Sequence, residues 1–208
     1  IDAFIVQDLG LIKLIREMAP DQVIHASTQM TITNDLAMKP LDDLGIERFV
    51  LGREVSLPEI EKIRAATEKE LEVFVHGALC VAYSGQCFTS ESIGGRSANR
   101  GQCAQSCRLD YDLIVDGKKY TSIDEKYLVS PKDLYGLDHI HKLQELGIES
   151  FKVEGRLKGP QYVASVGRLY KSEMIKNPNF SEGISKSSLE RVFSRGFFSG
   201  WLDGVEHQ

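Results

Sequence analysis

The 208-residue sequence has no apolar run close to the roughly 18 residues that a membrane-spanning helix needs, which excludes a spanning protein. It also lacks the basic and apolar opening segments of a secretory signal peptide, so a cytoplasmic location is expected. Its 25 Lys and Arg are outnumbered by 30 Asp and Glu, and the net charge of −5 excludes a generally basic nucleic-acid coat. A local basic patch for RNA stays open.

Several catalytic motifs are missing as well. Neither a G-x-G-x-x-G loop nor a Walker A loop follows an apolar run, which argues against a classical nucleotide-binding sheet. The sequence has no H-E-x-x-H and no G-x-S-x-G, so the common metalloprotease and serine hydrolase motifs are absent. Hydrophobic residues make up 42% and charged residues 26% of the chain, ordinary values that exclude wholesale disorder.

Short apolar runs begin near positions 3, 23, 48 and 71, and an amphipathic segment follows each of the first three. A strand–helix unit every 20 to 25 residues predicts a parallel α/β sheet, and the lack of alternation indicates strands buried on both faces. A doubly wound sheet and a (β/α)8 barrel both fit this rhythm. A further buried strand is predicted at 150–153. Helices are predicted over residues 9–18, 34–44, 57–67, 132–146, 160–175 and 186–193.

The rhythm breaks at His76, where a segment rich in Gly, Ser, Asn, Gln and Cys runs over residues 77–108. It is far longer than a typical strand-to-helix loop, and long ordered loops are usually functional. A hairpin is predicted next, with strands over 111–115 and 118–122 joined by Asp116-Gly117, the dipeptide of a type I′ turn.

All four cysteines lie in this segment, as Cys80-x6-Cys87-x15-Cys103-x3-Cys107. Only the last pair has the spacing of a structural zinc site, whereas four clustered thiolates without finger spacing suit an iron-sulfur cluster. Zinc, free thiols and disulfides are the alternatives, although the absence of a signal peptide favours metal over disulfides. Three nearby cations could stabilise thiolates or hold an anionic substrate: Arg96, Arg100 and Arg108.

Polar residues also follow the predicted strands. Because the carboxyl ends of parallel strands meet at one edge or mouth, these side chains are expected to converge there. The candidates are His25, Gln29, Arg53, Glu54, His76, Lys152, Glu154 and Arg156. Each has a structural alternative: a strand-end residue can cap the next helix, His25 can be a satisfied core histidine, and Glu154 with Arg156 can be a simple ion pair.

The segment 74–87, Phe-Val-His-Gly-Ala-Leu-Cys-Val-Ala-Tyr-Ser-Gly-Gln-Cys, resembles the motif of the peptidase U32, or collagenase-like protease, family. Matching stretches occur at 94–108, which contains Gly-Gly-Arg-Ser-Ala-Asn-Arg-Gly, and at 130–134, Ser-Pro-Lys-Asp-Leu. Others occur at 151–158, Phe-Lys-Val-Glu-Gly-Arg-Leu-Lys, at 25–29 and at 6–8. The tail over 193–205 looks like the ribosomal-RNA cytidine hydroxylase branch of that family.

This resemblance implies a (β/α)8 TIM-type barrel, represented here by its last five strand–helix units. The expected organisation is a partial barrel over 1–176 with a Cys-rich insertion at 77–122, then a linker and the start of a downstream region over 177–208. Family members begin with three further units, so Ile1 and Gln208 are expected to be cut points within a longer protein. Its open sheet edges would need covering, by a partner or an oligomer.

Some relatives in this family carry a [4Fe-4S] cluster and support hydroxylation of transfer RNA, ribosomal RNA or a ubiquinone precursor. In the RNA-modifying branch, the hydroxyl source is linked to prephenate. Carried over by position, the cluster ligands are Cys80, Cys87, Cys103 and Cys107. Some relatives take one ligand from elsewhere, and here Tyr135, not Cys, follows Ser-Pro-Lys-Asp-Leu.

The resemblance therefore predicts an iron-sulfur-dependent RNA hydroxylase that forms 5-hydroxycytidine in ribosomal RNA, with transfer RNA as the other possible target. Its expected partners are RNA and prephenate or a similar small anion, held by the arginines of the insertion and Arg156. His76 and Glu154 are the expected proton-handling groups. The alternatives are a collagenase-like peptidase, for which His76 with Cys80 is the only plausible Cys–His pair, and a non-enzymatic scaffold holding structural zinc.

Overall fold

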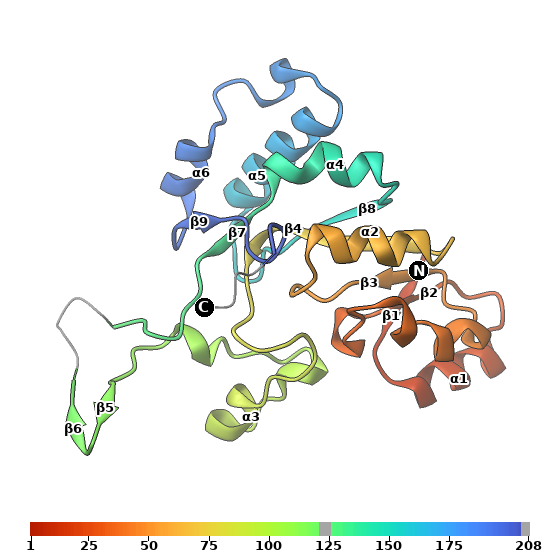
Figure 1. The fold of residues 1–208 in the computed structure, drawn as a ribbon, viewed down its shortest axis with the longest axis horizontal. Coiled ribbons are helices and arrows are strands. Elements are labelled where there is room, and N and C mark those ends of the chain that lie inside the picture. Colours follow the sequence, from red (N-terminus) through yellow and green to blue (C-terminus); the bar gives the residue numbers. More distant parts are fainter. Residues whose placement is uncertain (121–125, 205–208) are drawn as a thin grey trace.

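The structure, a computed structural model, describes residues 1–120 and 126–204. Five parallel strands lie side by side in chain order (Figure 1). They are β1 (Phe4–Val6), β2 (Ile24–Ala26), β3 (Arg48–Val50), β4 (Glu70–Ala78) and β8 (Ser150–Val153). The predicted parallel α/β sheet is confirmed. Among the described strands, β1 and β8 each have one unpaired edge, and closure into a TIM-type barrel stays a prediction.

The first two α-helices begin at capping residues that the sequence provides. Helix α1 (Leu9–Met18) begins after Asp8, whose carboxylate accepts the amide of Leu11 at 2.7 Å. Helix α2 (Leu57–Ala65) begins with a capping box in which Ser56 and Glu59 satisfy each other's backbone amides. The described helices also include α5 (Pro160–Met174) and α6 (Lys186–Val192), close to their predicted bounds.

The segment 34–44 differs from its prediction. Asn34 caps it, but the helix divides into two 3-10 pieces, Asp35–Ala37 and Lys39–Leu44. Pro40 lies at the start of the second piece, where its missing N–H and its ring prevent a continuous α-helix. Gly45 then ends the segment at a φ of 65°, which a residue with a Cβ adopts poorly.

The helix predicted over 132–146 begins only at Ile140. Its first residues instead form β7 (Asp133–Tyr135), which pairs antiparallel with residues 76–78 of β4, and α4 covers only Ile140–Glu145. The reason is that β4 is nine residues long and extends past the end of the three-residue β3, leaving a free edge that β7 occupies. All three residues of β7 are buried.

The tail predicted as a linker, 177–208, is packed onto the same core over its described part. Strand β9 (Phe197–Phe198) pairs with β7, so it joins the main sheet. Leu189 of α6 and Leu202 are buried in the core, and the carbonyl of Leu202 accepts the amide of Leu57 at the start of α2. The sequence spacing did not show what the apolar side chains of this tail would pack against. In the structure, Leu189 and Leu202 pack into the main core.

The Cys-rich insertion leaves the body after β4. It contains α3 (Thr89–Gly94), two single 3-10 turns, and a hairpin of β5 (Ile114–Val115) and β6 (Lys118–Lys119) that projects from the molecule (Figure 1). Asp116 and Gly117 both have positive φ, 50° and 75°, as a type I′ turn requires, so that prediction is confirmed. The predicted end of the second strand, Ser122, lies outside the described residues.

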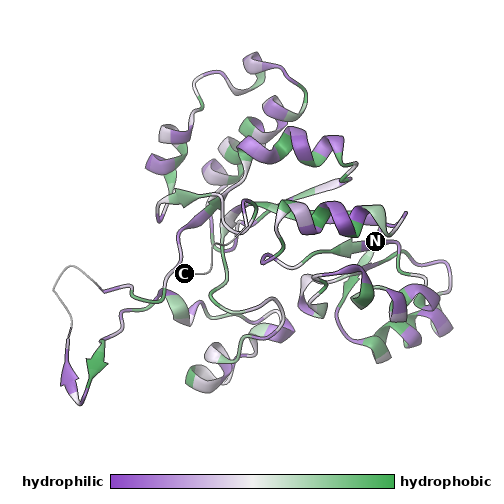
Figure 2. Ribbon diagram, in the orientation of Figure 1, coloured by the Kyte–Doolittle hydropathy of each residue, from purple (hydrophilic) through white to green (hydrophobic). Residues whose placement is uncertain are grey.

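Figure 2 shows apolar residues concentrated along the central strands and the inner helix faces, with β5 apolar and β6 hydrophilic in the projecting hairpin. Phe49, Leu71 and Val75 are fully buried at the centre of the sheet. None of the helices in the described ranges is long and apolar enough to cross a membrane.

Candidate functional site

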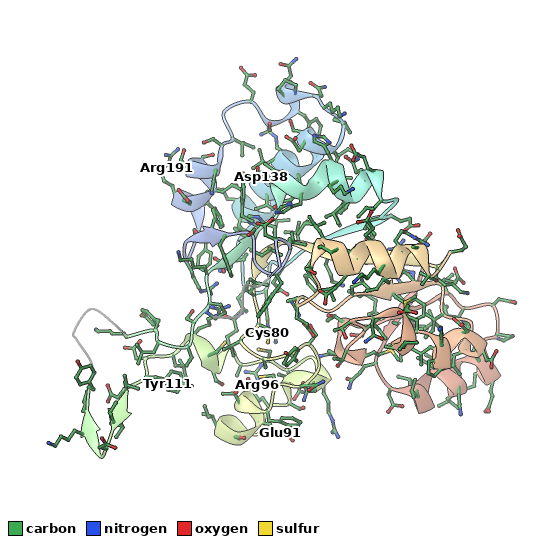
Figure 3. All side chains as sticks on the ribbon, viewed as in Figure 1. Cys80, Glu91, Arg96, Tyr111, Asp138 and Arg191 are labelled. Atoms are coloured by element: carbon green, nitrogen blue, oxygen red, sulfur yellow. The ribbon has the colours of Figure 1, made fainter. Side chains whose placement is uncertain are left out.

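A cavity of about 260 Å³ lies where the Cys-rich insertion meets the loops that follow β2, β3 and β8. All four cysteines line it. Figure 3 shows Cys80 near the centre of the molecule, below the end of β4 and facing the insertion that carries Arg96 and Glu91. The convergence of the four thiols on one site, expected from their spacing, is therefore realised by the fold.

The backbone around the insertion fixes the cysteines individually. The amide of Cys87 donates to the side-chain oxygen of Asn99 at 3.0 Å, and the amide of Gln105 donates to the sulfur of Cys103 at 3.3 Å. Cys107 lies in the 3-10 turn Ser106–Arg108. All four thiols are unbridged and partly exposed to solvent. Disulfides are thus absent from this arrangement.

Burial affects the pKa values of Cys80 and Cys107 more strongly than the nearby cations do. Burial raises the pKa of Cys80, although the amide of Ala82 and the charge of Arg53 act in the opposite direction. Burial likewise raises the pKa of Cys107, against the opposing charge of Arg108. Neighbouring thiols add to both increases, which shows that the four groups are close enough to repel one another once ionised.

The donor set fits an iron-sulfur cluster in chemical type and in location. Four thiols share one cavity, and one sulfur already accepts a backbone N–H, a kind of hydrogen bond that tunes such clusters. Over the described ranges, no three His, Cys, Asp or Glu side chains converge as a single metal ion requires. A [4Fe-4S] cluster would bind each thiolate through a different iron, so its four ligands need not meet at one point.

Charged side chains from two strand ends form one wall of the cavity. Nη2 of Arg53, after β3, lies 3.2 Å from Oε2 of Glu154, after β8, and the Arg53 guanidinium stacks 3.8 Å above the ring of Phe74. Oε1 of Glu154 accepts the amide of Arg156 at 3.0 Å. Nε of Arg53 is buried without a hydrogen-bond partner among the described residues.

Polar contacts tie the insertion to the loops after β2 and β3. Gln29 donates to the carbonyl of Ala98 at 2.8 Å. Ser84, only 2% exposed, donates to Glu54 at 2.9 Å and accepts the amide of Arg53 at 3.1 Å. Glu54 therefore does not line the cysteine cavity. It lies in the wall of a neighbouring, larger groove and positions the insertion from outside.

Arg108 lies at the base of the insertion. Its Nη1 donates to the hydroxyl of Ser130 and the carbonyl of Pro131, both at 2.6 Å, and its Nη2 donates to the carbonyl of Leu79 at 2.5 Å. The guanidinium therefore joins the two ends of the insertion, just before Cys80 and just before β7. Burial lowers the pKa of Arg108.

Four other predicted residues lie outside the cavity. Arg96 and Arg100 are exposed and do not line it. Lys152 binds Glu72 at 2.6 Å, within the sheet. Burial would raise the pKa of Glu72, but hydrogen bonds from Lys152 and Ser150 lower it overall. Burial and the charge of Arg48 lower the pKa of His25, which lies on β2 beside this ion-pair network. Lys152 thus belongs to the ion-pair network of the sheet, and none of the four residues lines the thiol cavity.

His76 is 1% exposed and is not in the cavity wall. Its ring is surrounded by four aromatic rings, from Tyr135, Tyr162, Tyr170 and Phe197, at centroid distances of 5.4 to 6.0 Å. Nδ1 lies 3.2 Å from the hydroxyl of Tyr170, while Nε2 has no partner among the described residues. Burial lowers the pKa of His76 to about 4. The predicted proton-handling role is not supported by this placement.

Several cavity residues were not singled out from the sequence, among them Ser84, Asn99 and Gln105. All three lie within the family-like motifs at 74–87 and 94–108. Motif membership was therefore the available signal, but the sequence did not show that Asn99 would hold the amide of Cys87, or that Ser84 would bridge Glu54 and Arg53.

Comparisons with known proteins identify the family of the chain. The model of "Peptidase family U32" matches residues 1–208. The chain is 42% identical over 172 residues to "tRNA hydroxylation protein P1" of Bacillus subtilis (strain 168), covering 80% of this chain and 41% of that protein. It is also 45% identical over 171 residues to "23S rRNA 5-hydroxycytidine C2501 synthase" of Escherichia coli (strain K12). That match covers 82% of this chain and 26% of that protein.

A third relative is "Collagenase" of Porphyromonas gingivalis (strain ATCC BAA-308 / W83), 34% identical over 221 residues, covering 98% of this chain and 53% of that protein. The solved structure described as "The Structure of the U32 Peptidase Mk0906" has a TM-score of 0.42 and 14% identity, over 74% of this chain and 55% of that one. The chain thus spans about a quarter to a half of the length of these curated relatives.

Proposed function

The chain belongs to the peptidase U32 family, and on that premise we propose that it is the cysteine-bearing part of an iron-sulfur-dependent RNA hydroxylase. Relatives named for transfer-RNA hydroxylation and for 5-hydroxycytidine synthesis in ribosomal RNA support an RNA substrate. The proposed product is 5-hydroxycytidine in ribosomal RNA, made in the cytoplasm, with transfer RNA as the second possible substrate.

One observation carries this proposal: four thiols and three guanidinium groups line the same small cavity, together with a single carboxylate. The thiols Cys80, Cys87, Cys103 and Cys107 would hold a [4Fe-4S] cluster. When bound, such a cluster supplies one-electron chemistry. Hydrolysis of a peptide would require a different set of groups, namely an activated nucleophile or a metal-bound water with a partner base.

Around the thiols, the protein's own side chains are suited to holding an anion. Arg156 is exposed, and its Nη1 binds only the carbonyl of Gly101, at 3.1 Å. Arg53 has its unpartnered Nε nearby, held in place by Glu154. We assign these two cations to the carboxylate of a prephenate-like hydroxyl donor. The cavity, at about 260 Å³, is smaller than a typical drug-sized ligand site, so it suits small groups rather than an extended peptide.

The chemistry balances with such a donor. Replacing C5–H of the cytosine by C5–OH withdraws two electrons from the base. The prephenate-linked donor gives up the oxygen and accepts those electrons, and the proton lost from C5 passes to a basic group. Glu154 is the carboxylate placed in the cavity wall, so it is the group of this chain that we assign to that proton.

The test begins with the metal. The chain prepared without oxygen should contain about four iron and four acid-labile sulfide per molecule and absorb broadly in the visible range. Each of the changes Cys80→Ala, Cys87→Ala, Cys103→Ala and Cys107→Ala should remove most of the iron. Thr89→Ala, which changes another residue of the cavity wall, is the matched control and should retain it. Protein with zinc and no iron would contradict the cluster.

The reaction is tested in cells. Ribosomal and transfer RNA from a strain lacking the gene should show loss of one hydroxylated pyrimidine by mass analysis of nucleosides. The intact gene should restore it, and the gene carrying Cys87→Ala should not. Unchanged nucleosides in both RNA classes would contradict the RNA-hydroxylase proposal.

The geometry gives less support to the peptidase alternative. The Cys–His pair that it requires is not formed, because Nδ1 of His76 contacts Tyr170 and its ring is enclosed by aromatic side chains away from the cysteine cavity. Burial also raises rather than lowers the pKa of Cys80, which keeps this thiol a weak nucleophile.

A further inference from the structure

The side chain of Arg108 is bound entirely by neutral acceptors. Its three hydrogen bonds go to two backbone carbonyls and one hydroxyl, from Leu79, Pro131 and Ser130. These acceptors satisfy three of the five N–H groups, but they do not neutralise the charge, which a guanidinium retains at all physiological pH values. The cation is half-buried, so water compensates it only in part.

Over the described ranges, no carboxylate pairs with Arg108. Asp133 is a nearby carboxylate, but both of its carboxylate oxygens are bound by Arg195, at 2.8 Å to Nη1 and 3.0 Å to the backbone amide. Arg195 itself adds positive charge near Arg108. A partly desolvated cation with a cationic neighbour requires a further anion to be stable.

Thiolates held in the cavity by a bound cluster would supply that anion. Cys107 directly precedes Arg108 in the 3-10 turn Ser106–Arg108, and Cys80 lies in the wall of the same cavity. Both line the cavity with Arg108, and Leu79, which accepts from Nη2, directly precedes Cys80. The same side chain thus lies beside two of the four thiols and holds the backbone next to one of them.

From this arrangement we infer that Arg108 is the positioning and charge-compensating residue of the thiolate centre, and that it stabilises the more negative, reduced state of that centre. The inference rests on the proposed function, since it requires a redox-active cluster on the four cysteines. A cation beside a cluster favours addition of an electron, so Arg108 raises the reduction potential. The exposed arginines of the insertion, Arg96 and Arg100, are screened by water and contribute little.

The test is a reductive titration of the cluster-loaded chain, followed by its visible and paramagnetic resonance spectra. Arg108→Gln should shift the reduction equilibrium at least tenfold toward the oxidised form, which is about 59 mV lower for a one-electron couple. Arg108→Lys keeps the charge and should restore most of the shift. Arg191→Gln removes the same charge from the exposed face of α6, far from Cys80 in Figure 3, and should leave the potential unchanged.

Ser130→Ala separates charge from geometry, because it removes one hydrogen bond of Arg108 and no charge. It should leave the potential close to that of the unmodified chain. If the reduction potential shifted as much in Ser130→Ala as in Arg108→Gln, the inference that Arg108 acts through its charge would be overturned. So would a loaded Arg108→Gln protein with an unchanged potential.

If Arg108→Gln fails to hold iron, Arg108→Lys decides the question. Iron retained by the lysine variant alone supports the need for a cation, whereas iron lost from both, with circular dichroism unchanged, overturns it. A chain that binds no iron in its unmodified form would instead contradict the proposed function, and the Arg108 inference with it.

Discussion

Arg53 and Glu154 are 101 residues apart in the sequence, yet Nη2 of one lies 3.2 Å from Oε2 of the other in the wall of the cysteine cavity. The Arg53 and Glu154 side chains are only 17% and 26% exposed. The pair joins the loop after β3 to the loop after β8, on either side of the central strand β4. It therefore fixes the width of the site that the four cysteines share.

Loss of this pair should destabilise the fold. Glu154→Ala leaves the largely buried Arg53 guanidinium without its anion, and the free energy of unfolding should fall by about 1.5 to 3 kcal/mol. Urea unfolding measures this change. Glu173→Ala is the control, because it removes an acid that pairs with His141 where both partners are about 40% exposed, and it should cost less than about 1 kcal/mol. Equal losses in the two variants would contradict the structural role of Glu154.

Gly85 should tolerate no side chain. It has a φ of 76°, and a Cβ there would overlap the carbonyl oxygen of Gln29, at the point where the insertion crosses the loop after β2. A left-handed backbone alone costs a residue with a Cβ roughly 1 to 2 kcal/mol. The free energy of unfolding of Gly85→Ala should therefore fall by well over that amount. It should also bind less iron, because Cys87 follows two residues later.

Gly101 provides the matched control for that change. Its φ is 77°, nearly the same, but no atom lies within 4 Å of the Cβ that alanine would add. Gly101→Ala should show the backbone cost without the clash, again measured by urea unfolding. If both alanine variants were equally stable, the close approach of Gly85 to Gln29 would not contribute to folding.

His76 should make stability depend on pH. Burial lowers its pKa to about 4 from an ordinary value of 6.5, so the unfolded chain binds the proton more readily. Its contribution is complete above pH 6.5 and is lost as the pH falls toward 4, by up to about 3 kcal/mol. Urea unfolding of the metal-free chain at intervals between pH 7 and pH 4 measures it.

The comparison variants for this prediction are His76→Phe, which suits the surrounding aromatic rings, and His76→Gln, which keeps a polar contact to Tyr170. Both remove the titrating group. Their unfolding free energies should fall less steeply with decreasing pH than that of the unmodified chain, whatever their stability at pH 7. A pH dependence unchanged in both variants would show that His76 is not the buried neutral group described here.

Local sequence signals predicted local structure well. The capping box of Ser56 and Glu59, the cap at Asp8 and the turn at Asp116-Gly117 each involve residues within a few positions of one another, so their contacts form wherever the rest of the chain lies. The regular recurrence of buried apolar runs determined the parallel sheet for the same reason, because each strand–helix unit is short.

The sequence also predicted which types of residue form the site. The gathering of four cysteines in one segment predicted a shared site, and strand-end positions predicted that Arg53, Glu154 and Arg156 would join it. Sequence position could not separate these residues from Lys152 and His25, which lie beside the ion pair of the sheet. Both sets follow or lie on strands, and only the register of each strand decides which way a side chain points.

What the sequence alone determined is the recurring strand–helix order of the parallel sheet and the chemical inventory of the site. The tertiary structure decided which groups meet. It decided that β7 would occupy the free edge of β4, that His76 would be enclosed by aromatic rings, and that Arg108 would bind both ends of the insertion. These contacts join residues 20 to 100 positions apart. Their free energy depends on burial and on competing partners, and neither exists until the whole chain has packed.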